Sequence, residues 1–135
     1  MQNRIYLDYN ATSPIRNESR KAMISALEVM GNPSSVHLEG RAAKAIIEKA
    51  RTQISDAFGV GCRDIVFTSG ATEAAALALN GQGFQAANIE HDAVTAWVKP
   101  ILPFESGEVR VSAPEKTALQ LANSETGIIQ KLPKN

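Results

Sequence analysis

An apolar run from Ile65 to Thr68 leads without a break into Ser69-Gly70-Ala71-Thr72-Glu73, and this junction restricts the fold more than any other part of the sequence. The run is short, is preceded by charged residues, and suits a buried strand of a parallel sheet. The alanine-rich stretch from about Thr72 to Asn80-Gly81 predicts a helix. The junction therefore predicts a parallel strand that passes at once into a helix.

Two more helices are predicted upstream of this junction. The first has apolar residues at the spacing of one helical face, stops at Gly31-Asn32-Pro33, and is expected to dock on a core. Its face consists of Met23, Ala26, Leu27 and Met30. The second is the longest, with an apolar stripe that begins at Ala43 and ends at Phe58, before Gly59 and Gly61. A short β-prone segment, Ile5 to Leu7, precedes both helices.

The region after Gly81 predicts smaller elements. The candidates are a poor strand at 86–89, a short helix capped by Asp92 and ending before Pro100, hairpin strands at 101–104 and 109–112, and a last strand at 117–122. The interval between Val111 and Ala118 is too short for a parallel crossover. Consecutive strands there are therefore expected to run antiparallel, or one of them not to form.

Composition excludes several classes of partner. The chain has 135 residues, 44% of them hydrophobic, and its 14 basic and 14 acidic residues give a formal net charge of zero. We expect one globular domain that binds neither nucleic acid nor an anionic membrane, since both need a clustered excess of Lys and Arg. Cys62 is the single cysteine, so an internal disulfide is impossible and a reducing cytoplasm fits. Asp8 interrupts the N-terminal segment before a signal-length apolar run can develop, and no apolar stretch is long enough to span a membrane, so we expect neither export nor membrane insertion.

The strand-to-helix junction predicts an anion site. Backbone N–H groups at a helix start have no intrahelical acceptor, and the positive end of the helix dipole favours a phosphate. Gly70 allows close approach of the backbone, Ala71 presents an unobstructed N–H, and Thr72 adds a hydroxyl donor. The alternative is a plain N-cap, in which Ser69 or Thr72 satisfies the helix donors and Glu73 complements the dipole. The residues alone favour neither alternative.

Two histidines and the cysteine are the remaining candidates. His91 comes at an expected strand end, where an imidazole can stack on a planar cofactor or act as a surface or capping residue, and the second role is the commoner one. His37 lies in a polar loop, so a surface or capping role is a stronger expectation for it than for His91. Cys62 has no histidine near it in sequence, so we expect a structural or incidental thiol and not a nucleophile.

Five sequence blocks stand out together, namely Tyr6 to Thr12, Gly31 to His37, Ile65 to Glu73, Glu90-His91, and Asn123 to Gln130. In this order they resemble the cysteine desulfurases, which belong to the class V aminotransferases. The resemblance implies an α/β fold, specifically part of the three-layer α/β/α large domain of the pyridoxal phosphate-dependent transferases of fold type I. It also implies one partial domain over 1–135, with an N-terminal arm at 1–15 and a portion of the cofactor domain at 16–135, truncated after the Asn-Ser-Glu block.

The resemblance assigns roles to four residues. The family uses pyridoxal phosphate to remove sulfur from L-cysteine, leaving alanine and a persulfide on an enzyme cysteine, and it serves iron–sulfur cluster assembly and related pathways. Carried over by motif, Ala71 and Thr72 hold the cofactor phosphate, His91 stacks on the pyridine ring, and Asn123 brings an amide near the phenolic oxygen. Ser124 stands where the family has a second asparagine.

Other family residues have no counterpart in this sequence. The family attaches its cofactor to a lysine in a Ser-x-His-Lys motif, but here His37 precedes Leu38 and His91 precedes Asp92. The persulfide-forming cysteine, the arginine that grips the substrate carboxylate and the acid that pairs with the pyridine nitrogen lie further along family chains. We therefore expect no catalytic residue and no metal ligand here, and weak or no binding of pyridoxal phosphate.

Two readings of the resemblance stay open. In the first, the chain is the N-terminal part of a desulfurase-like protein, inactive as an isolated chain, whose site is completed by another chain or by a missing remainder. In the second, it is a non-catalytic remnant that dimerises or binds an anion as an interaction module. Class V relatives are homodimers, and half of a large domain leaves apolar surface uncovered. Both readings therefore predict self-association or a complementing chain.

Overall fold

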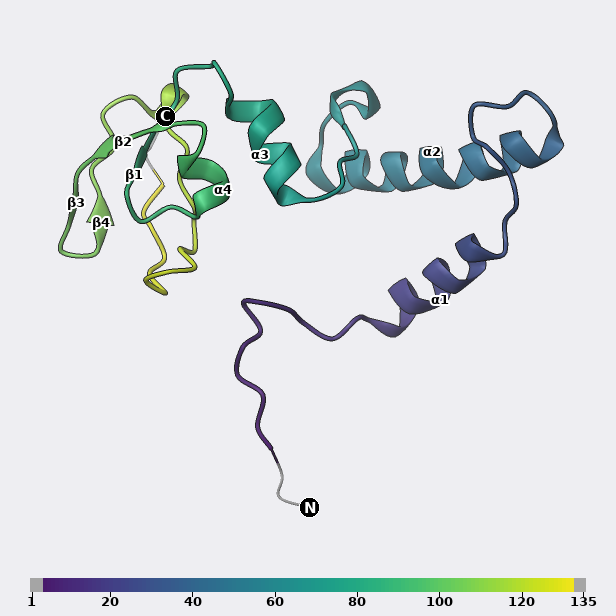
Figure 1. Cartoon of the computed structure of the whole chain (residues 1–135), viewed down its shortest axis with the longest axis horizontal. Coiled ribbons are helices and arrows are strands. Elements are labelled where there is room, and N and C mark those ends of the chain that lie inside the picture. Colours follow the sequence, from purple (N-terminus) through teal and green to yellow (C-terminus); the bar gives the residue numbers. More distant parts are fainter. Residues whose placement is uncertain (1–3, 133–135) are drawn as a thin grey trace. The chain divides into compact units, whose positions relative to one another are not determined.

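The chain divides into two compact units, Met1–Phe67 and Thr68–Asn135. The computed structural model describes residues 4–132, and Figure 1 labels their helices and strands in chain order. None of the helices in this range is both long enough and apolar enough to cross a bilayer.

The first unit is helical. It contains α1 (Asn17–Leu27), α2 (Leu38–Phe58) and a 3₁₀ turn, η1 (Cys62–Asp64). Both predicted helices are confirmed, although α1 ends at Leu27, before Met30. The β-prone segment Ile5 to Leu7 forms no strand, and the nearby Tyr6 hydroxyl donates to the Asp8 carbonyl oxygen at 2.7 Å.

The ends of α2 explain the residues that surround it. His37 is its N-cap, with Nδ1 accepting from the Gly40 N–H at 3.4 Å, and Gly59 ends it in the left-handed conformation at φ 66°. Gly40 is buried because the preceding turn packs on it. A Cβ at this position would lie 2.3 Å from the Ser35 carbonyl oxygen and 2.8 Å from that of Asn32. The turn after Gly31 and the first turn of α2 therefore fit together only through a glycine.

The apolar faces of the two helices are not covered in the described structure. On α1, Met23 is 58% exposed and Leu27 is 85% exposed, and none of its residues is buried. On α2 only Gly40 and Ser55 are buried, while Phe58 is 77% exposed. The prediction that the first helix docks on a core is wrong for this structure, because residues 4–67 supply no second apolar layer.

The segment Ile65 to Thr68 is not the buried strand that its composition predicts. It has no strand partner within residues 4–132, and Val66 is 72% exposed. Arg51 of α2 holds the segment instead, because its Nη1 donates to the Ile65 carbonyl oxygen and its guanidinium lies 4.8 Å from the centroid of the Phe67 ring. A β-prone sequence becomes a strand only where another strand supplies the ladder.

The second unit contains α3, four short strands, α4 and a 3₁₀ turn. Their bounds are α3 Ala71–Leu79, β1 Gln85–Ala87, α4 Asp92–Thr95, β2 Lys99–Leu102, β3 Phe104–Glu105, β4 Glu108–Val109 and η2 Pro114–Lys116. The predicted third helix and the short helix at Asp92 are confirmed. The cap of the short helix is His91, and Asp92 is its first residue.

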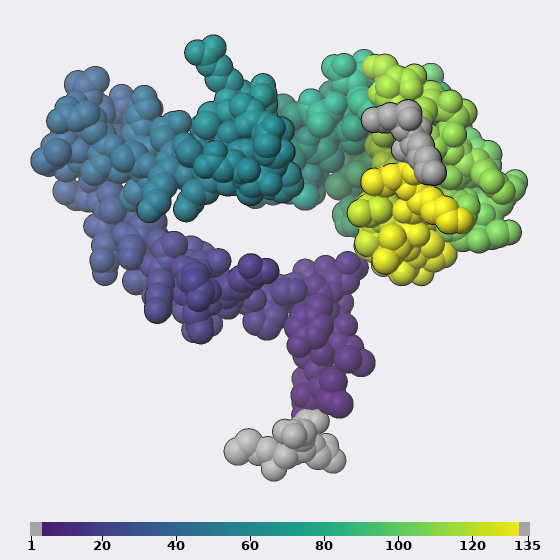
Figure 2. All heavy atoms as spheres, turned by 180° about the vertical axis from the view of Figure 1, so that it is seen from behind, coloured from purple at the N-terminus to yellow at the C-terminus, as the bar shows by residue number. Residues whose placement is uncertain are grey.

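The core of this unit lies between β1 and β2. The two strands pair in parallel, joined by α4, and Figure 1 shows them side by side. Ala86 and Ala87 are completely buried, and Leu102 is 6% exposed. Figure 2 shows the atoms around these strands, coloured green to yellow, gathered into one mass. The segment with the weakest β-propensity is thus the centre of the core, because small side chains let other segments approach it closely.

The hairpin and the last candidate strand had different outcomes. β3 and β4 pair antiparallel through a turn in which Ser106 and Gly107 have positive φ, so the predicted hairpin is confirmed in a shorter form. Residues 117–122 do not form the predicted strand. They make only two isolated bridges, a parallel one between Thr117 and Gln85 and an antiparallel one between Ala122 and Ile129.

Candidate functional site

The N-terminus of α3 places the predicted phosphate-binding residues at the surface. Gly70 is the N-cap and has no side chain to cap the helix donors, and the first helical bond runs from the Ala74 N–H to the Gly70 carbonyl oxygen at 3.1 Å. The N–H groups of Ala71 and Thr72 therefore precede the helical ladder. Both residues are exposed. The start of α3 thus offers free donors to an anion.

Glu73 occupies one part of this helix start. Its Oε2 accepts from the Ser69 N–H and from the Ser69 hydroxyl, each at 2.6 Å. These two donors lower the pKa of the Glu73 carboxyl, with the hydroxyl as the larger cause. The plain N-cap alternative is therefore realised in part, since the carboxylate takes the donors of Ser69. It leaves the donors of Ala71 and Thr72 without a side-chain acceptor at the cap.

The loop gives Gly70 no structural reason to be glycine. Its φ of 169° is ordinary extended backbone, and a Cβ added there meets no heavy atom within 4 Å. The Thr68 hydroxyl closes the loop by donating to the Gly70 carbonyl oxygen at 3.0 Å. The open space over Gly70 is what a phosphate approaching the backbone requires.

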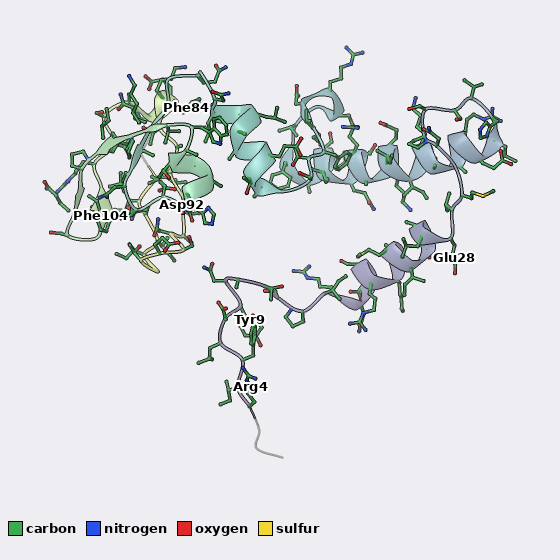
Figure 3. All side chains as sticks on the ribbon, viewed as in Figure 1. Arg4, Tyr9, Glu28, Phe84, Asp92 and Phe104 are labelled. Carbon is green, nitrogen blue, oxygen red and sulfur yellow. The ribbon has the colours of Figure 1, made fainter. Side chains whose placement is uncertain are left out.

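His91 lies at the start of α4, in the same unit as α3. Its Nδ1 accepts from the Ala93 N–H at 3.0 Å, which caps the four-residue helix. The capping role anticipated as the commoner one is thus observed, and the residue is exposed. α3 packs against α4, so the first unit is not needed to bring the two helices together. In Figure 3 the labelled Asp92 marks this end of α4.

A pocket of about 260 Å³ lies beside His91. Its lining is strongly acidic and consists of Asn88, Glu90, His91, Asp92 and Glu125. Three carboxylates repel a phosphate and favour a neutral or cationic group. Within this unit, the start of α3 therefore suits the anionic end of a ligand, and the surroundings of His91 suit a ring.

Asn123 is buried rather than displayed. Its side chain is 2% exposed, and its Nδ2 donates to the Ile89 carbonyl oxygen at 2.9 Å. Its Oδ1 accepts from the N–H groups of Glu125 and Thr126 and from the Thr126 hydroxyl, at 2.9 to 3.0 Å. Direct contact of Asn123 with a cofactor stays a prediction, and the structure gives the amide a set of internal partners.

Glu90 is a buried residue whose role the sequence did not reveal. It is 4% exposed, and both of its carboxylate oxygens lie 3.2 Å from the N–H of Gln120, which donates to them. The partner is thirty residues away in sequence, so no local pattern predicts this contact. His37 is an exposed helix cap, in line with its expected surface role. Cys62 is an exposed cysteine outside any disulfide, and the expectation that it is not a nucleophile stays a prediction.

Comparison with known proteins identifies the family. Residues 5–131 match the aminotransferase class-V family. The chain belongs to the class V aminotransferases. The predicted resemblance to cysteine desulfurases and the predicted α/β fold are thereby confirmed, the latter by a solved NifS-like protein with a TM-score of 0.76 and 32% sequence identity.

Several members of this family are similar to the chain over part of their length. It is 46% identical over 85 residues to the cysteine desulfurase IscS of Dictyoglomus turgidum, and 47% identical over 73 residues to the selenocysteine lyase of Homo sapiens. These alignments cover 62% and 53% of this chain but only 22% and 16% of the two relatives. The match to the NifS-like protein covers 94% of this chain and 43% of that one. The chain thus spans less than half the length of its class V relatives.

Proposed function

We propose that this chain supplies the phosphate-binding part of a pyridoxal phosphate site in a cysteine desulfurase-like protein. The observation that carries the proposal is the uncapped start of α3, with free donors at Ala71 and Thr72 and open space over Gly70. The motif at this place is the one that cysteine desulfurases have, and relatives with that name match the chain. The donors present at α3 fit a phosphate.

The residues of this chain would bind and orient the cofactor. Ala71 and Thr72 would hold the phosphate through a backbone N–H and a hydroxyl, while the exposed ring of His91 would lie against the pyridine ring. When bound, pyridoxal phosphate supplies an electron-accepting ring for chemistry at the substrate α-carbon. The proposed substrate is L-cysteine. We further propose that the protein is cytoplasmic and dimeric, and that the sulfur removed from L-cysteine serves iron–sulfur cluster assembly.

Catalysis by these 135 residues alone is not part of the proposal. Neither histidine precedes a lysine, so the covalent attachment point of the family motif has no counterpart in this sequence. We expect no alanine to be released from L-cysteine by the chain in the presence of pyridoxal phosphate. Release of alanine at a steady rate by the purified chain would contradict this expectation.

Binding is tested by titrating the chain with pyridoxal phosphate and following the fluorescence of Trp97. Trp97 is the single tryptophan and lies just after α4, in the same unit as the proposed site. Pyridoxal without the phosphate is the matched ligand, because it forms the same adducts with surface lysines. We expect saturable binding of pyridoxal phosphate that inorganic phosphate competes for, and weaker binding of pyridoxal.

A pair of threonine variants tests the location of the site. Thr72→Val removes the proposed phosphate donor, and a lost hydrogen bond to a charged group corresponds to roughly tenfold or more in affinity. Thr52→Val makes the same change on α2, where the hydroxyl donates to the Glu48 carbonyl oxygen. We expect only Thr72→Val to raise the Kd of pyridoxal phosphate. Equal effects of both variants, or equal binding of pyridoxal and pyridoxal phosphate, would overturn the proposal.

The exposed apolar faces favour a second candidate function, an interaction module. Met23 and Leu27 on α1 and Phe58 on α2 are more than half exposed, which is unusual for large apolar residues in such number on one unit. This candidate predicts self-association without any cofactor. Sedimentation at high micromolar concentration tests it, and a strictly monomeric chain would rule it out.

A further inference from the structure

Asn123 is the most completely enclosed polar side chain in the described structure. It begins a turn that the Asn123 N–H and the Ile128 carbonyl oxygen close at 3.0 Å, and the Gly127 N–H donates to its carbonyl oxygen at 2.9 Å. The side chain lies inside this turn with 2% exposure. A ligand arriving from solvent therefore finds almost no surface of Asn123 to touch.

The carboxamide of Asn123 joins two segments that are distant in sequence. Its Oδ1 accepts three hydrogen bonds from Glu125 and Thr126, which fixes the turn itself. Its Nδ2 points the other way and donates to the Ile89 carbonyl oxygen at 2.9 Å. A carbonyl oxygen has two lone pairs, so the oxygen side of the amide has no capacity left for a ligand.

The segment that Asn123 holds is the one that carries His91. Ile89 and Glu90 directly precede His91, and each is tied to the same distant stretch of chain. Ile89 accepts from Asn123 through its carbonyl oxygen, and Glu90 accepts from the Gln120 N–H through its carboxylate. These two tethers fix where α4 begins, and the ring of His91 caps that beginning by accepting from the Ala93 N–H.

We infer that Asn123 is a positioning residue, which fixes the His91 ring by holding the Ile89 carbonyl oxygen, and that it does not itself contact the cofactor. The inference rests on the proposed function for the role of His91 toward a pyridine ring. It rests on the structure alone for the tether between Asn123 and Ile89. The two parts can therefore fail separately.

Two variants separate the tether from the turn. Asn123→Asp retains acceptors for Glu125 and Thr126 but replaces the Nδ2 donor with an oxygen that faces the Ile89 carbonyl oxygen. Thr126→Val is the matched control, because it removes one bond to the Asn123 oxygen and leaves the bond to Ile89 intact. Both variants lose a hydrogen bond of the same side chain.

Hydrogen exchange at two capped amides gives the readout. The Ala93 N–H reports the His91 cap, and the Gly40 N–H, capped by His37 in the other unit, is the internal reference. We expect Asn123→Asp to speed exchange at Ala93 about tenfold, as the loss of one buried hydrogen bond does, and to leave Gly40 unchanged. Thr126→Val should leave Ala93 unchanged. Unchanged exchange at Ala93 in Asn123→Asp would overturn the inference.

Cofactor binding distinguishes the two failures. Where Asn123→Asp speeds Ala93 exchange and also raises the Kd of pyridoxal phosphate, both parts hold. Faster Ala93 exchange with an unchanged Kd overturns the role of His91 in the proposed function and leaves the tether standing. A raised Kd with unchanged Ala93 exchange means direct contact by Asn123, and the inference is wrong.

The wild-type chain provides a test that needs no variant to fold. Side-chain amide resonances of Asn123 are followed by NMR during the titration with pyridoxal phosphate. We expect the ring signals of His91 to shift and those of the Asn123 amide to stay within the change seen with inorganic phosphate. A larger shift of the Asn123 amide than of the His91 ring would contradict the inference.

Discussion

Replacing Gly70 with alanine separates what the fold needs from what a ligand needs. The added Cβ meets no heavy atom within 4 Å, and φ is 169°, so the variant introduces neither a clash nor backbone strain. Glycine is a somewhat better N-cap than alanine, which sets the stability cost of Gly70→Ala below about 1 kcal/mol. We therefore expect the thermal unfolding of the variant to stay close to that of the wild type.

Ligand binding should respond much more strongly to the same change. A methyl group over the loop keeps a phosphate away from the N–H groups of Ala71 and Thr72. Loss of one hydrogen bond to a charged group amounts to about 1.5–3 kcal/mol, which is roughly 10- to 150-fold in the Kd of pyridoxal phosphate. The assay is the Trp97 fluorescence titration, run on both proteins.

Gly59→Ala is the matched control for this prediction. Gly59 has φ 66° at the end of α2, where a Cβ also meets nothing within 4 Å, so the variant suffers left-handed strain of about 1–2 kcal/mol without approaching the site. It should lose stability and keep its affinity. If Gly70→Ala binds pyridoxal phosphate as the wild type does, or is less stable than Gly59→Ala, the reasoning about the loop is refuted.

Two further predictions concern Gly40 and Glu73. Gly40→Ala places a Cβ 2.3 Å from the Ser35 carbonyl oxygen, and overpacking of this kind costs about 1–3 kcal/mol of stability. Hydrogen exchange in the first turn of α2 should therefore accelerate. Unchanged exchange would contradict the packing of the preceding turn on α2. The lowered pKa of the Glu73 carboxyl stabilises the fold at pH values above the ordinary glutamate pKa, and this stabilisation is lost as the pH falls through the lower folded pKa. The Ser69 hydroxyl is the largest cause of the shift, so Ser69→Ala should raise the pKa of Glu73 toward the ordinary value. A carbon-detected NMR titration of the Glu73 carboxyl checks this, and an unmoved pKa would show that the Ser69 hydroxyl is not the main cause.

The sequence predicts the helices well because their signals are local. The apolar stripe of α2 and the left-handed glycine after it lie within the helix and its cap. The start of α3 is likewise predicted by the local residues Ser69 to Glu73. The same holds for the hairpin, whose turn residues Ser106 and Gly107 adopt the positive φ that the turn requires.

The position of the core and the buried contacts could not be predicted from local patterns, because their causes lie elsewhere in the chain. Val66 has the composition of a core strand but lacks a neighbouring strand within residues 4–132, whereas Ala86 and Ala87 have little β-propensity and form the core. Asn123 looks like a ligand-binding residue in its motif. Its hydrogen bond to Ile89 spans thirty-four residues and is visible only once the chain has folded.

Backbone amide NMR during a titration with pyridoxal phosphate shows whether the start of α3 binds the phosphate. We expect the amide signals of Ala71 and Thr72 to shift with saturation, inorganic phosphate to move the same signals, and pyridoxal to leave them in place. Shifts confined to residues outside the start of α3, or no shifts at saturating cofactor, would show that the phosphate does not bind there.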